Sequence, residues 1–99
     1  MSEITVSCDL TNDYIGNVCV SLAGHDAGLV MVVVGVCGEY LLLANGKTRK
    51  ISAPKKKKAK HVSTISRLDD KTRDAIICGS ANDSLLRREI SRVICQKLN

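Results

Sequence analysis

The sequence contains almost no aromatic residues. Tyr14 and Tyr40 are the only two, and phenylalanine and tryptophan are absent. Modules that bind single-stranded RNA stack bases on exposed aromatic rings, and sites for methylated lysine surround the ammonium with such rings. Two tyrosines cannot supply either arrangement. The composition therefore excludes recognition through an array of stacked bases and excludes an aromatic cage.

The sequence also lacks the cysteine pairs of a metal site. None of its five cysteines forms a Cys-x-x-Cys pair, and neither His25 nor His61 lies three to five residues from a cysteine. A structural zinc site needs four convergent ligands, usually in close sequence pairs, so we expect no metal and no cofactor. Most of the cysteines lie in apolar surroundings and are interpreted as reduced thiols of the core: Cys19, Cys37, Cys78 and Cys95.

Long apolar runs are missing as well. The longest, residues 29–36, is far shorter than the roughly 20 residues that cross a membrane. The N-terminus has neither the basic nor the apolar region of a signal peptide, so a cytoplasmic location without a membrane partner is expected.

A catalytic constellation is absent too. His25 and Asp26 stand together without a nucleophile or a third orienting group, and no Lys-Ser or Lys-Thr follows the nearby glycines. We therefore expect a protein that is not an enzyme and has no small-molecule substrate.

Positive charge is confined to one part of the chain. Residues 1–46 contain no lysine or arginine, whereas residues 47–67 hold nine of the fifteen and no acidic residue. Such a segment creates a local positive field, for which polyphosphate is the commonest partner. A solvated basic loop, non-specific attraction of polyanions, and a nuclear targeting signal at 54–60 remain alternatives. Arg87, Arg88 and Arg92 are a further candidate basic patch near the C-terminus.

Alternating and β-branched patterns predict five short strands. Val18, Val20 and Leu22 alternate with smaller residues, and Gly24 and Gly28 supply the positive φ that a reversal at 22–28 requires. Asn45-Gly46 predicts a type I′ hairpin whose second strand is followed by a basic loop at 52–59. The predicted strands run from Ile15 to the turn at 22–28 and over 29–36, 39–44, 47–51 and 60–65.

Strands this short favour closure into a barrel, because closure removes exposed edges. We predict a mainly β protein with a five-stranded SH3-like barrel over residues 15–66, a flexible N-terminal extension over 1–14, and a helical segment over 67–99. Capping boxes that begin at Ser66 and Ser80 predict two helices, the first ending at Gly79. The second helix is amphipathic and is expected to pack on the barrel, with a partner helix as the alternative.

Residues 15–34, with a glycine-bearing loop that ends at Gly28, resemble a KOW motif. Together with Leu43-Ala-Asn-Gly-Lys-Thr-Arg-Lys50 and Ala53-Pro-Lys-Lys-Lys-Lys-Ala-Lys-His61, they resemble the small KOW-motif RNA-binding proteins of bacteria. These are similar in turn to KOW-containing large-subunit ribosomal proteins of archaea and eukaryotes. The resemblance implies an SH3-like barrel of the KOW type and RNA binding on or near the ribosome.

The resemblance also implies which residues contact RNA. Gly24 and Gly28 would shape the first loop, in which His25 and Leu29 stand where basic residues are common and Asp26 would repel RNA. The expected RNA-binding residues are Lys47, Arg49, Lys50, Lys55, Lys56, Lys57, Lys58, Lys60 and His61.

The sequence thus favours a monomeric RNA-binding protein whose partner is ribosomal RNA or the large ribosomal subunit. Specificity is expected from RNA shape and 2′-hydroxyl contacts. The alternative is a protein-interaction module of a transcription or translation complex, in which the lysines serve only solubility.

Overall fold

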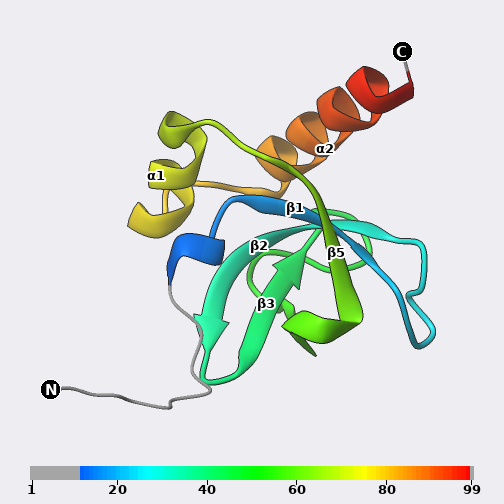
Figure 1. The fold of residues 1–99 in the computed structure, drawn as a ribbon. Helices are drawn as coiled ribbons and strands as arrows, with labels where there is room; N and C mark the ends of the chain where they lie inside the picture. Colours follow the sequence, from blue (N-terminus) through cyan, green and yellow to red (C-terminus); the bar gives the residue numbers. More distant parts are fainter. Residues whose placement is uncertain (1–11, 99) are drawn as a thin grey trace, which may run out of the picture.

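The computed structural model describes residues 12–98, which form a curled five-stranded sheet with two helices on one side of it (Figure 1). The strands are β1 (Asn17–Ser21), β2 (Val30–Cys37), β3 (Tyr40–Ala44), β4 (Lys55–Lys58) and β5 (Val62–Arg67). The helices are α1 (Asp70–Cys78) and α2 (Asp83–Leu98), and two 3₁₀ turns are η1 (Asn12–Tyr14) and η2 (Ala59–His61).

All strand pairs are antiparallel, in the order β4-β3-β2-β1-β5. The expected five-stranded sheet and helical segment are confirmed, but the sheet is not closed into a barrel, because no ladder joins β4 to β5 within residues 12–98. The loop between β1 and β2 bridges this gap. The amide of Leu22 donates to the carbonyl of His61 at 2.9 Å, and Lys57 of β4 reaches the same loop.

The predicted hairpin at Asn45-Gly46 is wrong, and so is the strand at 47–51. A type I′ turn needs positive φ at both central residues, yet no non-glycine residue among those described has positive φ. The Asn45 side chain instead accepts hydrogen bonds from the amides of Lys47 and Arg49, each at 2.9 Å, and thereby stabilises a wider turn. The partner of β3 is the lysine run itself, in the segment that we predicted to be a loop.

Both helices begin one residue after a side-chain cap. Asp69 Oδ1 accepts from the amide of Thr72 at 3.0 Å at the start of α1, and Asn82 Oδ1 accepts from the amide of Leu85 at 2.9 Å at the start of α2. The predicted capping boxes are therefore wrong, since Ser66 belongs to β5 and the Ser80 hydroxyl donates to the carbonyl of Ala75 in α1. The predicted stop is confirmed, because Gly79 ends α1 in the left-handed region at φ 82°.

The sheet and the helices share one hydrophobic core. The amphipathic pattern of α2 buries Leu86, Ile90 and Val93, so the helix packs on the sheet as expected. The strands contribute Val18, Met31, Val32, Val33, Leu41 and Leu43, and α1 contributes Ile76. Residues 67–98 are thus a structural part of the domain.

Most of the predicted flexible extension, residues 1–11, lies outside the described residues. The last three residues of the predicted extension, 12–14, form η1, and Tyr14 packs against the core. Arg73 of α1 holds this turn by donating to the carbonyls of Ile15 and Asn12, each at 3.0 Å. Residues 12–14, which we had assigned to the flexible extension, therefore belong to the folded domain.

The prediction of buried thiols is correct for Cys19 only. Cys37, Cys78 and Cys95 are exposed, since they stand at the end of β2, at the end of α1 and on the solvent side of α2. Within residues 12–98 no cluster of three or more His, Cys, Asp or Glu side chains is arranged to hold a metal. No helix in that range is long and apolar enough to span a bilayer.

Candidate nucleic-acid interface

The lysine run is divided between two faces because it forms a strand. Successive side chains of a strand point to opposite faces, and β4 is an edge strand paired only with β3. Lys57 lies opposite Leu41 and Lys55 opposite Leu43, and both leucines are fully buried. Lys56 and Lys58 project from the other side, which we call the outer face of β4. The four consecutive lysines therefore lie in two different environments.

Lys57 is an internal residue. Its side chain is only 9% exposed, and its ammonium donates to Ser21 Oγ at 2.9 Å, to the Ala23 carbonyl at 2.7 Å and to Asp26 Oδ1 at 2.6 Å. An ammonium has three hydrogens, so these bonds use its whole donor capacity. Lys57 therefore stabilises the fold, and its predicted role in contacting RNA does not agree with this structure.

Asp26 is the partner that holds Lys57 in the interior. The carboxylate accepts from Ser21 Oγ at 3.0 Å as well as from Lys57, and Lys55 Nζ lies 3.6 Å from its second oxygen. The hydrogen bond from Lys57 is the main reason why the pKa of Asp26 falls to about 2. This charge is buried and balanced by two lysines, so the structure gives no support to the expected repulsion of RNA by Asp26.

Two glycines shape the loop that carries Asp26, as the sequence predicts. Gly24 and Gly28 have φ of 85° and 91°. The amide of Gly28 donates to the Ser21 carbonyl at 2.8 Å and closes the loop, while the amide of Ala27 donates to Gly24 at 3.2 Å. The turn brings Asp26 over Lys57. The contact between this loop and β4 was not foreseen, because the two residues are 31 positions apart.

The outer face of β4 presents cations beside an aromatic ring. The ammonium groups of Lys56 and Lys58 lie 5.5 Å and 5.9 Å from the centre of the Tyr40 ring on β3. Lys58 also lies 3.6 Å from Glu39. Sequence reasoning missed Tyr40, whose place follows only from the observed register, in which it lies opposite Lys58. The face offers cations for phosphates and one ring for a sugar or a single base.

Further exposed basic residues stand at both ends of β4. Lys60 and His61 follow the strand in η2, and both are exposed. Lys47 and Lys50 are exposed in the connection that precedes the strand, where Arg49 is half-buried. The structure thus places seven of the nine predicted residues on the outer face of β4 or in its two flanking segments. Lys55 and Lys57 are directed towards Asp26 instead.

Lysines on this strand also have a structural consequence. An edge strand exposes unpaired amides and carbonyls, and lysine side chains protect such an edge from pairing with another chain. This effect accounts for some positive charge on β4 without any ligand. It does not account for Lys47, Lys50 or Lys60, which lie outside the strand.

The second candidate patch on α2 is largely engaged within the protein. Arg87 donates to the Gly46 carbonyl at 2.6 Å and to Ser84 Oγ at 3.0 Å. Arg92 pairs with Glu89, and Arg88 lies 3.6 Å from the same carboxylate. Arg87 thus connects α2 to the 45–50 turn, whereas Arg88 and Arg92 pair within the helix, where the buried Glu89 partly balances their charge.

Known proteins add no assignment. A scan against protein-family models and a search of curated proteins each gave no match.

Proposed function

We propose that this protein binds structured RNA through the outer face of β4 and the basic residues at its two ends. The observation that carries the proposal is that β4 directs its lysines to two opposite faces. Lys55 and Lys57 satisfy Asp26, whereas the other lysines of residues 47–60 have side chains directed to solvent at the strand and its flanks.

The mechanism is electrostatic. Each cation that meets a phosphate displaces condensed counterions, and the resulting affinity depends on salt but not on sequence. Tyr40 is the one aromatic ring beside these cations within residues 12–98, so stacking contributes for one nucleotide at most. Selectivity then comes from RNA shape and 2′-hydroxyl contacts.

We propose that the curled sheet is an SH3-like barrel of the KOW type in which, within residues 12–98, no ladder joins β4 to β5 and the loop between β1 and β2 bridges the two edges. Strands β1 to β4 form a meander, β5 returns to pair with β1, and η2 joins the two edge strands. This connectivity supports the proposal, as does the loop that bridges the edges. The resemblance of residues 15–61 to KOW-motif proteins favours ribosomal RNA, on or near the large subunit, as the target.

The test is sedimentation of the tagged protein in lysate of its native host, in gradients at low and at high salt. We expect salt-sensitive migration with the large ribosomal subunit or its precursors, and loss of this migration after ribonuclease treatment. Migration at the top of the gradient at low salt would reject stable association with the ribosome.

The competing hypothesis is a protein-interaction module whose lysines only maintain solubility. It predicts that partner recovery survives ribonuclease and survives replacement of Lys56, Lys58 and Lys60 by glutamine. RNA binding predicts that both treatments abolish recovery. These substitutions spare Lys57, whose removal would disturb the fold under either hypothesis.

A further inference from the structure

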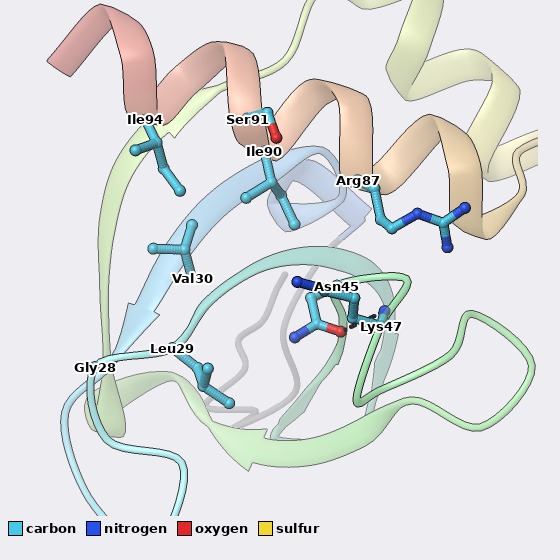
Figure 2. Close-up of a pocket in the computed structure, with 9 residues that line it drawn as sticks. All are labelled: Gly28, Leu29, Val30, Asn45, Lys47, Arg87, Ile90, Ser91 and Ile94. Carbon is cyan, nitrogen blue, oxygen red and sulfur yellow. Dashed lines mark hydrogen bonds between the residues drawn. The ribbon is translucent and has the colours of Figure 1, made fainter. Parts of the chain in front are cut away.

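A groove lies between α2 and the two loops that face it (Figure 2). One loop leads into β2 at Leu29 and Val30, and the other follows β3 at Asn45 and Lys47. The groove has a volume of about 400 Å³, which is within the size range of ligand-binding sites. Lys56 and Lys58 of the outer face of β4 do not line the groove, and Lys47 is the one lining residue that also belongs to the basic surface proposed for RNA.

The groove gathers apolar side chains that the fold leaves uncovered. Leu29 and Ile94 are 37% and 38% exposed, and both line it. They are two of the four large hydrophobic residues that are exposed within residues 12–98. Ile90 precedes Ile94 by one helical turn and is buried at the same site. The apolar stripe of α2 therefore continues beyond the part that the sheet covers.

Positive charge stands at one end of this apolar surface. Lys47 is exposed, and its ammonium has no ion-pair partner among the described residues. Arg87 lies beside it, and its guanidinium bonds only to Gly46 and Ser84 in that part of the chain. No aspartate or glutamate lines the groove. A complementary occupant must therefore join an apolar group to an anionic one.

We propose that the groove binds a short segment of another protein in which an apolar side chain lies close to acidic residues. The apolar side chain would pack between Leu29 and Ile94, and a carboxylate would pair with Lys47. Leu29, Ile94 and Lys47 are all exposed in the groove, so its lining is open to solvent. Such a surface suits a chain that passes across it better than a small molecule that must be enclosed. Ser91 offers a hydroxyl to the backbone of such a segment. This proposal does not depend on RNA binding.

The test is selection of displayed random 12-residue peptides on the full-length protein after removal of nucleic acid. We expect an enriched family that combines an apolar residue with aspartate or glutamate. Ile94→Ser should weaken a synthetic member about tenfold, since it removes one buried aliphatic contact. Lys47→Glu should weaken it more at low salt than at high salt. The matched controls Leu22→Ser and Lys71→Glu change exposed residues outside the groove and should alter affinity less than about twofold.

A second measurement uses the unaltered protein. Addition of the selected peptide should shift the methyl resonances of Leu29, Val30 and Ile94, and leave that of Ile77 on α1 unchanged. The proposal is overturned if no such family is enriched, or if the enriched peptides respond to Leu22→Ser rather than to Ile94→Ser. It is also overturned if the protein forms oligomers that Ile94→Ser abolishes, because a second copy would then occupy the groove.

Discussion

Lys57 Nζ lies 2.6 Å from Asp26 Oδ1, and the two side chains are only 9% and 7% exposed. This ion pair fixes the loop between β1 and β2 against the edge strand β4. When one partner of a buried pair is removed, the other remains as an uncompensated charge in the interior. The same pair removes a lysine from the surface that we propose for RNA.

The first prediction concerns the contribution of this pair to stability. Asp26→Asn and Lys57→Met should each lower the free energy of unfolding by about 3 kcal/mol, because each leaves the remaining charged partner buried without its counter-charge. The double variant should lose less than the sum of the two single losses. Urea unfolding at neutral pH measures all three. Lys56→Met, on the outer face of the same strand, is the control and should change stability by less than about 0.5 kcal/mol; equal losses at both lysines would refute the assignment.

The second prediction concerns the effect of acid. The pKa of Asp26 falls from its ordinary value of 3.8 to about 2, chiefly because of the hydrogen bond from Lys57. A carboxylate with a lowered folded-state pKa contributes stability above its unfolded value and loses it as pH falls through the folded value. The stability difference between the unaltered protein and Asp26→Asn should therefore be largest above pH 4 and shrink towards pH 2. A difference that stays constant over that range would contradict the assigned pKa.

The third prediction concerns the contact between the 45–50 turn and α2. A Cβ added at Gly46 would lie 2.3 Å from the backbone oxygen of Asp83, whereas one at Gly28 would meet nothing within 4 Å. Both glycines have positive φ, so Gly28→Ala should lower the free energy of unfolding by about 1–2 kcal/mol, the cost of a left-handed backbone at a residue with a Cβ. Gly46→Ala should lower the free energy of unfolding by more than this, since α2 must shift to make room for the added Cβ. If thermal unfolding shows similar losses of stability for the two variants, α2 does not contact this turn closely.

The fourth prediction concerns thiol reactivity in the native protein. In a Cys8→Ser background, Cys37, Cys78 and Cys95 should react quickly with a thiol reagent because they are exposed. Cys19 should react only on unfolding, since it is buried and burial raises the pKa of its thiol more than the hydrogen bond with Thr64 lowers it. Fast labelling of Cys19, identified by peptide mass, would contradict the packing of β1.

The sequence predicted those parts of the fold that depend on local patterns. Alternation located β1, β-branched residues located β2, and the amphipathic stripe located α2. It failed where a distant contact decides the outcome. Asn45-Gly46 has the composition of a tight hairpin, yet the contact of Gly46 with α2 and the pairing of β3 with residues 55–58 produce a wider turn.

In the candidate site, too, the local pattern was predicted and the distant contacts were not. The concentration of lysines was visible in the sequence, but their orientation was not, because a strand assignment decides which of them face Asp26. Lys57 could not be separated from Lys56 without knowing that Leu41 and Leu42 lie opposite them on different faces. Tyr40 was known only as a rare aromatic residue, and its position beside Lys56 and Lys58 depends on that register.

The most direct test of RNA binding through the outer face of β4 is the salt dependence of affinity for purified ribosomal RNA from the native host. Each phosphate contact contributes about 0.7 to 0.9 to the slope of log K against log salt. Replacing Lys56 and Lys60 by glutamine should therefore flatten the slope by about 1.5, while replacing Lys71 and Arg88, which removes the same charge from the helices, should leave it unchanged. Equal flattening by the two pairs, or no flattening by the first, would contradict the proposed interface.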